Sequence, residues 1–475
     1  MSKARSADVT GLVAMDGGLA KLAQGRFRLL RKHDSAKPAI RPMTTWRIGI
    51  AGIGTVGGAL LKLIQDRPGY VPGCEIRVVG VSARSRHTGR TANIDEYPWF
   101  DDPVALASSP DLDMFVELIG GSDGTAKAAV EAALSCGKPV VTANKALIAE
   151  HGLELARLAE ANNVPLLFEG GVMGGTPAVK ILRESLIGAQ VDSVSGILNG
   201  TCNYILSTME SGGGVFSDVL AEAQRLGYAE SDPTMDVGGF DSAHKISILA
   251  ALAFECAPSY SVVEVEGIQD VDLIDIKLAE EFGYRVRLIA SAVRTERGIS
   301  ARVHPMLVSK TNPLASTHGA LNALFIKGPR IGEIFILGMG AGGGSTATGV
   351  ASDIAEVMAG AQRPVFRQPA DTLESVAPVD ADHQLSKAYI RVMVKDESGA
   401  VAAVSEALAE SDVSIERMLQ KPVSDLDHVP IAITTHETSE KQLLAAVRHI
   451  AGLKVVTAIP RMIRIAADDD RSIES

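Results

Sequence analysis

The chain has 475 residues, enough for about three domains of ordinary size. Its formal net charge of −11 argues against nucleic acid or an anionic membrane as a main partner, and no apolar run approaches the ~18 residues that a membrane span needs. The four cysteines are scattered without a C-x-x-C pair, so neither a disulfide framework nor a zinc site is indicated. We therefore expect a reduced, soluble, cytoplasmic protein.

A basic extension, residues 1–45, precedes the first regular pattern. Its first 42 residues hold nine Lys or Arg against three Asp, a net of +6. Transit peptides share this Arg-rich, acid-poor character, although no long hydrophobic segment for secretion is present. Alternatively, Met43 is the start of the native protein. We expect residues 1–42 to be disordered or only marginally helical, and residues 467–475 to form a flexible tail.

A dinucleotide-binding fingerprint comes next. Residues 47–53 predict a short buried strand that runs into G-x-G-x-x-G at 52–57 and then into the helical sequence GALLKLI. The first glycine makes the tight turn, the second lets the backbone approach the pyrophosphate, and the third lets the helix pack on the strand. A second predicted strand at 75–83 completes the spacing of a βαβ unit. We expect these residues to contact the cofactor: Gly52, Ile53, Gly54, Thr55, Val56 and Gly57.

The end of the second strand bears on the choice of cofactor. NAD sites usually place an acid there for the ribose hydroxyls, whereas an arginine accommodates the 2′-phosphate of NADP. The chain has Ser-Ala-Arg-Ser-Arg at 82–86 and no acid. NADP is therefore favoured over NAD, with Arg84 or Arg86 as the phosphate partner. Two solvated arginines on a loop are the alternative.

Three further predicted strands end in polar or glycine-rich segments. The first covers residues 113–121 and ends in two glycines, Gly120 among them. The second covers residues 139–143 and leads to Asn144 and Lys145 at the start of a helix. The third covers residues 165–168 and enters a glycine-rich turn. Ligands gather outside the carboxyl ends of strands in an open parallel sheet. A lysine in the first turn of a helix is electrostatically unfavourable, so its presence there indicates a function. An exposed lysine at a turn, with no function, is the alternative.

The stretch 227–245 (GYAESDPTMDVGGFDSAHK) is the most informative part of the chain. Its loop carries Glu230, Asp232 and Asp236, and the helix that follows places Asp241 and Lys245 one turn apart on the same face. Three apolar residues share the helical stripe of the lysine, so its ammonium points toward the core. A lone Asp-x-x-x-Lys is more often a surface ion pair, but a buried ammonium beside a carboxylate indicates an active site.

These motifs together resemble homoserine dehydrogenase, the NAD(P)-dependent enzyme that interconverts L-aspartate 4-semialdehyde and L-homoserine. The similarity runs from about residue 46 to about residue 360 and includes ELIGG at 117–121, VVTANKALIA at 140–149 and GILNGTCNYIL at 196–206. The run at 227–245 is its most specific part. The resemblance implies an oxidoreductase acting on a CH–OH group of a small-molecule substrate, in threonine, methionine and isoleucine biosynthesis.

The resemblance also implies roles for single residues. Lys145 and Lys245 correspond to two lysines implicated in catalysis, and Asp241 to the acid that positions the catalytic ammonium. Glu230 corresponds to the carboxylate that binds the substrate amino group. Asp236 and Lys145 are further substrate contacts. Which lysine donates the proton stays open.

Further cofactor contacts are expected outside the fingerprint, and the resemblance also implies a cation site. The expected cofactor contacts beyond the fingerprint are Arg84, Gly120, Asn144, Lys145 and Gly340. A monovalent-cation site for Na⁺ or K⁺ matches the backbone around Glu169, Val172, Gly174 and Thr176. Met173 stands where the family commonly has glycine, which puts the cation geometry in doubt because a Cβ restricts φ. Ser231, where Pro or Ala is usual, is the other departure.

The C-terminal part has a separate pattern. Residues 363–385 are rich in Pro and polar residues and are typical of a linker. Strands at 388–395, 414–420, 428–435 and 454–465, with helices at 400–410 and 439–451, give the ferredoxin-like order β-α-β-β-α-β. The pieces at 396–399 and 413–420 resemble an ACT domain, which implies feedback control by an amino acid, with threonine as the expected effector. A dimerisation domain that binds nothing is the alternative.

The predicted fold class is α/β. A Rossmann-type doubly wound parallel sheet spans 46–177 and is completed by 313–360, and an α+β catalytic, substrate and dimerisation domain spans 178–312. A linker at 361–386 leads to the ferredoxin-like ACT domain at 387–466. We expect a homodimer or homotetramer, because a sheet with one uncovered face must bury it.

Two other functions compete with this interpretation. A hydroxy-acid or prephenate dehydrogenase with an ACT domain would need a catalytic histidine held by a carboxylate, and only His244 lies in an acid-rich setting. A catalytically inactive amino-acid sensor would bind nucleotide for regulation alone.

Overall fold

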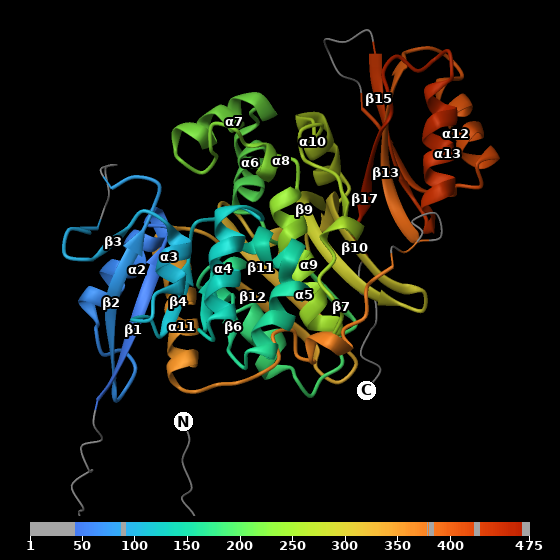
Figure 1. Cartoon of the computed structure of the whole chain (residues 1–475). Helices are drawn as coiled ribbons and strands as arrows, with labels where there is room; N and C mark the ends of the chain where they lie inside the picture. Colours follow the sequence, from blue (N-terminus) through green and yellow to red (C-terminus); the bar gives the residue numbers. More distant parts are fainter. Residues whose placement is uncertain (1–42, 87–91, 378, 380–383, 422–427, 468–475) are drawn as a thin grey trace, which may run out of the picture. The chain divides into compact units, whose positions relative to one another are not determined.

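The structure is a computed structural model that describes residues 43–86, 92–377, 379, 384–421 and 428–467 (Figure 1). The chain divides into a unit of Met1–Thr44 and a unit of Thr45–Ser475, with the first strand beginning at their junction. The expectations for residues 1–42 and for the tail beyond Ala467 lie outside the described residues. No helix in the described part of the chain is long and apolar enough to cross a membrane.

The first sheet has the strand order β3-β2-β1-β4-β5-β6 over the described residues. Their bounds are β1 Thr44–Ala51, β2 Cys74–Ser82, β3 Trp99–Phe100, β4 Met114–Glu117, β5 Val140–Thr142 and β6 Leu166–Leu167. Strand β1 pairs in parallel with β4, β4 with β5, β5 with β6, and β2 with β3. The strand order reverses between β1 and β4, which is the switch point of a doubly wound fold. The predicted Rossmann-type sheet is confirmed.

In the part of the chain that the structure describes, five helices accompany this sheet. They are α2 Thr55–Asp66, α3 Pro103–Ser108, α4 Thr125–Ser135, α5 Lys145–Ala161 and α11 Gly343–Met358. Helix α11 comes from far along the chain, yet its Val350 and Ile354 share a core with Ile48 and Ile50 of β1. The segment after Gly340 therefore returns to the nucleotide-binding region and closes it against α2.

The second sheet is mixed and has the strand order β12-β11-β7-β9-β10-β17-β13-β15-β14. The bounds in its first part are β7 Ser193–Ile197, β9 Tyr284–Thr295, β10 Gly298–Ser309, β11 Leu321–Gly328 and β12 Gly332–Met339, with the two-residue β8 Glu264–Val265 beside β10. The helices there are α6 Gly200–Gly212, α7 Phe216–Arg225, α8 Thr234–Val237, α9 Phe240–Phe254 and α10 Leu273–Glu281. Residues 241–254 of α9 are all buried, and the helix packs on β7, β9 and β10.

The ACT region follows the predicted order. Its elements are β13 Leu385–Lys395, α12 Ala400–Glu410, β14 Ile415–Gln420, β15 His428–Thr435, β16 Thr438–Ser439, α13 Glu440–Ala451 and β17 Arg461–Ile465. Figure 1 shows α12 and α13 together on one face of its strands. The last strand is shorter than expected, because residues 454–460 contribute only an isolated bridge between Val456 and Val394. Strand β17 lies between β13 and β10, so the ACT sheet continues the sheet of the preceding region.

The segment predicted as a linker packs against the molecule where it is described. Phe366 is fully buried and its ring lies 5.6 Å from that of Phe168. Arg367 has φ +71° and donates hydrogen bonds to backbone carbonyls of Leu252 and Leu186. The sequence did not predict this packing, because the segment is rich in Pro and polar residues and its few buried side chains have no regular spacing.

Candidate active site

A cavity of about 710 Å³ lies between the loops after β4 and β5 and the helices α6 and α9. Residues far apart in the chain meet there. The predicted site residues that line it are Thr55, Val56, Gly120, Asn144, Lys145, Val172, Glu230, Asp236, Asp241, Lys245 and Gly340.

Asp241 lies between two ammonium groups in this cavity. Its Oδ2 accepts a hydrogen bond from Nζ of Lys245 at 2.8 Å, and its Oδ1 lies 3.1 Å from Nζ of Lys145. Burial by itself would raise the pKa of the Asp241 carboxyl, but the two lysines hold it below its ordinary value. The charge on Asp241 in turn raises the pKa of Lys145, against the effect of burial. The site therefore holds an ionised carboxylate and keeps Lys145 cationic.

Each lysine reaches Asp241 from a different element. Lys145 is the first residue of α5, where the N-cap Asn144 accepts from the backbone of Leu147 and donates from Nδ2 to the carbonyl of Gly121 at 2.7 Å. The lysine side chain is 37% exposed, in the cavity lining. Lys245 is 8% exposed, and its Nζ also donates to the carbonyl of Leu198 at 2.7 Å. Its predicted burial on α9 is thus observed.

Two further carboxylates line the cavity. Burial raises the pKa of Asp236, and the charge on Asp241 adds to the effect. Glu230 is exposed on the loop between α7 and α8. That loop is anchored at Tyr228, whose carbonyl accepts from the hydroxyl of Thr201 at 2.6 Å. Asp232, by contrast, accepts from the backbone N–H and the hydroxyl of Thr234 within the loop.

Asn199 joins this group and was not singled out from the sequence. Its Nδ2 donates to Asp236 at 2.7 Å and to Asp241 at 2.9 Å. The signal in the sequence was an Asn directly before the helical run GTCNYIL, which predicts an N-cap but not contacts with residues 37 and 42 positions away.

A second cavity, of about 600 Å³, adjoins the fingerprint and shares Gly120 with the first. Gly52, Ile53, Gly54 and Arg84 line it, whereas Arg86 does not. Gly52 has φ +97°, which favours glycine. A Cβ at residue 57 would lie 2.1 Å from the carbonyl oxygen of Gly52, whereas a Cβ at residue 54 would meet no atom within 4 Å. The backbone thus packs closely at one glycine and leaves open space at the other, as a bound pyrophosphate requires.

Glu117 shapes the wall between these cavities and was also missed as a site residue. It is fully buried at the end of β4, where its carboxylate accepts from the backbone N–H groups of Ile119 at 2.6 Å and Gly120 at 3.0 Å. The hydroxyl of Thr142 donates to its other oxygen at 2.5 Å. Burial raises the pKa of Glu117, although these hydrogen bonds oppose the shift. The residue holds the Ile119–Gly120 turn in place.

The predicted cation segment is buried beside the first cavity. The carboxylate of Glu169 accepts hydrogen bonds from the backbone N–H groups of Ala178, Val179 and Lys180. Both of its oxygens are therefore occupied by these backbone groups. Gly174 has φ +59°, whereas Met173 is not among the described residues with positive φ. The Cβ of Met173 is therefore compatible with its backbone. Among the described residues, no hydrogen bond reaches the carbonyl oxygens of Val172 or Gly174.

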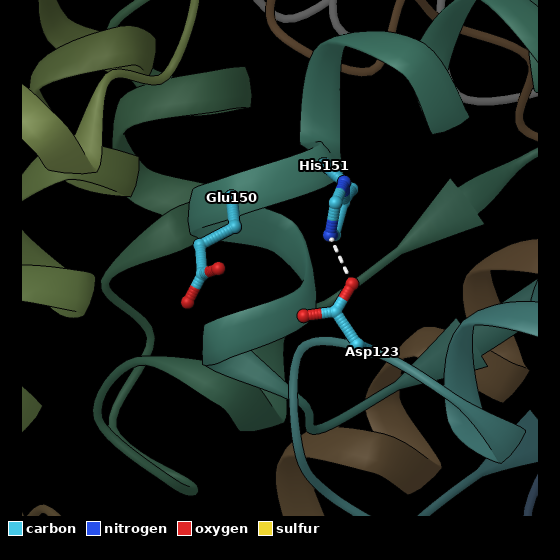
Figure 2. Close-up of side chains that lie close together, drawn as sticks. All are labelled: Asp123, Glu150 and His151. Carbon is cyan, nitrogen blue, oxygen red and sulfur yellow. Dashed lines mark hydrogen bonds and ion pairs between the residues drawn. The ribbon is translucent and has the colours of Figure 1, made fainter.

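No histidine in the described part of the chain lines the first cavity. His244 stacks on Tyr260, with ring centroids 4.2 Å apart, and its Nε2 lies 3.3 Å from Glu150. Asp123, Glu150 and His151 form a small group on the surface (Figure 2), in which Nε2 of His151 already pairs with Asp123 at 3.0 Å. Both histidines contact a carboxylate, but neither lines the first cavity, where the rival dehydrogenases would need their catalytic histidine.

The doubly wound sheet, the glycine fingerprint and the Lys–Asp–Lys group define a nucleotide-binding oxidoreductase with a C-terminal ACT domain. The homoserine dehydrogenase profile matches residues 177–355, the profile of its NAD-binding domain matches 52–169, and an ACT domain profile matches 388–454. The homoserine dehydrogenase of Neisseria gonorrhoeae is 40% identical over 434 residues, which cover 89% of this chain and 99% of the relative. The chain belongs to the homoserine dehydrogenase family, whose members are oxidoreductases acting on a CH–OH group.

Further relatives agree. The enzyme of Pseudomonas aeruginosa is 37% identical over 435 residues, with 88% of this chain and 98% of that protein covered. A crystal structure of a homoserine dehydrogenase from Thiobacillus denitrificans superposes with a TM-score of 0.82 at 37% identity, covering 90% of this chain and 99% of that one. A hyperthermophilic archaeal homoserine dehydrogenase mutant in complex with NADPH gives a TM-score of 0.59 at 32% identity, covering 67% and 99%.

Proposed function

We propose that this chain catalyses the reversible NAD(P)H-dependent reduction of L-aspartate 4-semialdehyde to L-homoserine. The observation that carries the proposal is Asp241 between Nζ of Lys145 and Nζ of Lys245, in a cavity that adjoins the nucleotide fingerprint. Neither the inactive-sensor function nor a histidine-based dehydrogenase accounts for two lysines on one buried carboxylate.

The chemistry needs positive charge and a proton at the substrate oxygen. When bound, the nicotinamide cofactor supplies the hydride to the aldehyde carbon. The developing alkoxide then needs cationic groups nearby, and a lysine ammonium provides both charge and proton. Asp241 keeps the two ammonium groups together in spite of their mutual repulsion. Either lysine is suited to donate the proton.

The amino group of the substrate requires a carboxylate. Glu230 and Asp236 line the same cavity as the two lysines. Glu230 is the better suited to bind the substrate ammonium, because it is exposed on an anchored loop, whereas Asp236 is already bonded to Asn199.

We further propose NADP as the preferred cofactor. Arg84 follows β2 and lines the second cavity, where the 2′-phosphate of NADP would lie, and no acid occupies the end of that strand. We also propose a monovalent cation, Na⁺ or K⁺, at the backbone of Glu169, Val172, Gly174 and Thr176, because the carbonyl oxygens of Val172 and Gly174 accept no hydrogen bond from the described residues.

Regulation and assembly complete the proposal. The ACT region would bind an amino-acid effector, threonine in the first instance, near residues 396–399. Strand β12 is an edge strand with one exposed row, Phe335, Leu337 and Met339. Such a row favours burial against a second subunit, in a homodimer or homotetramer.

The test is homoserine-dependent reduction of NADP⁺ by purified protein, with NAD⁺ run alongside. Turnover that disappears in Lys245→Ala but persists in Lys62→Ala, an exposed lysine outside both cavities, would support the reaction. A higher kcat/KM with NADP⁺, lost in Arg84→Ala, would support the cofactor assignment. Absence of turnover in a protein that still binds nucleotide would favour the inactive sensor instead.

A further inference from the structure

Asn199 contacts two carboxylates of the proposed active site, those of Asp236 and Asp241. It ends the segment after β7, and its side chain is the N-cap of α6. Oδ1 accepts a hydrogen bond from the backbone N–H of Cys202 at 2.8 Å. Because that N–H can only donate, Oδ1 must face it, and both N–H groups of Nδ2 go to Asp236 and Asp241.

The bridge joins two groups of like charge in a buried place. Asn199 is 4% exposed, so water does not replace its contacts. Each N–H of the amide stabilises the ionised form of one carboxylate, which offsets the repulsion between the two. The hydrogen bond from Asn199 accordingly opposes the effect of burial on the pKa of Asp236.

The residues on either side of Asn199 fix its position. The carbonyl oxygen of Leu198 accepts from Nζ of Lys245 at 2.7 Å and from Nδ2 of Asn322 at 2.8 Å. At Gly200, a Cβ would lie 2.7 Å from the carbonyl oxygen of Ala320, so the backbone packs closely there. This three-residue segment cannot shift without moving the Asp241–Lys245 pair.

We propose that Asn199 is a positioning residue for the reaction. It holds Asp236 and Asp241 together as carboxylates, and through Asp241 it sets the positions of the two lysine ammonium groups. The inference rests on the proposed function, since these carboxylates matter only if they serve the substrate. A helix cap alone would need only an acceptor, and Asp or Ser is as good a cap as Asn.

Two substitutions separate the bridge from the cap. Asn199→Asp keeps the shape and the capping acceptor but replaces the donors by a third carboxylate. Asn199→Ser keeps a cap without added charge and offers one O–H in place of two N–H donors. We expect both proteins to bind NADPH normally, with kcat/KM for homoserine lowered about 100-fold because the reacting groups are misplaced.

The pH profile is the readout that a purely structural role would not change. Loss of the bridging donors raises the pKa of the carboxylates, so the acid limb of kcat/KM should move to higher pH. The shift should be larger in Asn199→Asp, which adds a negative charge. Asn203→Ser is the control: this buried Asn of the same helix donates to the carbonyls of Thr317 and Gly319 and touches neither carboxylate. It should lower stability while leaving the acid limb in place.

The outcomes are distinguishable. Unchanged kcat/KM and an unmoved acid limb in both variants would overturn the proposal and leave Asn199 as a helix cap. Should Asn199→Asp fail to bind NADPH, Asn199→Ser decides the question. Activity retained in Lys245→Ala, measured in parallel, would instead contradict the proposed function itself, whatever the Asn199 variants show.

Discussion

At the scale of single residues, the centre of the site is one carboxylate that contacts two lysine ammonium groups. Lys145 and Lys245 are 100 positions apart in the sequence, yet both contact Asp241. Lys245 is nearly inaccessible to water, so its charge has no solvent to stabilise it if the carboxylate is lost. We therefore expect stability and activity to depend on the same group.

Asp241→Asn should damage both properties. Removing one partner of a buried ion pair costs about 3–5 kcal/mol, because the remaining charge stays buried and uncompensated. We expect a lower midpoint of chemical denaturation together with loss of homoserine oxidation. Asp232→Asn is the matched control, since Asp232 is exposed and, among the described residues, its hydrogen bonds stay within its own loop. Equal stability of the two variants would contradict the buried-pair argument.

The pH dependence of activity should report on Asp236. Burial raises the pKa of this carboxyl, and Asp241 adds to the shift. If the ionised form serves the substrate, kcat/KM falls as the pH drops through a pKa above the usual value of about 4. Asp236→Asn should remove that limb and raise KM for homoserine. A profile unchanged by the substitution would show that another group titrates there.

At the scale of elements, the start of α2 shows that two glycines of one motif can be required for different reasons. Gly54 and Gly57 belong to one fingerprint but face different surroundings. A side chain at 57 would meet the backbone of Gly52 at 2.1 Å, whereas a side chain at 54 would meet open space in the nucleotide cavity.

Alanine substitutions should separate these two constraints. Gly57→Ala should destabilise the fold by about 1–3 kcal/mol, because neither backbone can move aside. Gly54→Ala should leave the unfolding transition in place but weaken NADPH binding, because a methyl group then occupies the approach of the pyrophosphate. Thermal unfolding and fluorescence titration with NADPH measure the two effects. Similar melting temperatures for both variants would rule out the packing argument.

At the scale of the whole unit 45–475, the ACT region is joined to the catalytic region by a shared sheet and by buried charge. Strand β17 pairs with both β10 and β13. Asp275 of α10 is fully buried and accepts hydrogen bonds from the hydroxyl of Tyr389 and from Nε of Arg391, both on β13. These contacts join the ACT region directly to α10.

Asp275→Asn should therefore destabilise the unit, by about 3–5 kcal/mol for a broken buried pair. Of the two carboxylates that contact the guanidinium of Arg391 in the described part of the chain, Asp272 would remain, and its side chain is 63% exposed. Asp272→Asn is the control and should cost at most about 1 kcal/mol, as exposed pairs do. Thermal unfolding monitored by circular dichroism gives the comparison. A melting temperature unaffected by Asp275→Asn would mean that the ACT region is attached by the sheet alone.

Local patterns were sufficient for much of the fold. The strand, glycine motif and helix at 47–64 were predicted because the G-x-G-x-x-G spacing between a strand and a helix is typical of a dinucleotide-binding turn. The order of ACT elements followed from hydrophobic periodicity and turn residues. The burial of Lys245 was predicted from its helical stripe, although the role in catalysis that we expect for it came from the resemblance to a family.

Contacts between distant segments were beyond such reasoning. An Asn before a helix predicts a cap and nothing about Asp236 or Asp241, and the final strand gave no sign that it would pair with β10. Buried polar groups must find hydrogen-bond partners, but several partners are equally compatible with the sequence. The sequence by itself determined which elements form and which side chains could do chemistry, because those depend on neighbours within a few residues. Only the tertiary structure decided which of those side chains meet, since that depends on how whole elements pack.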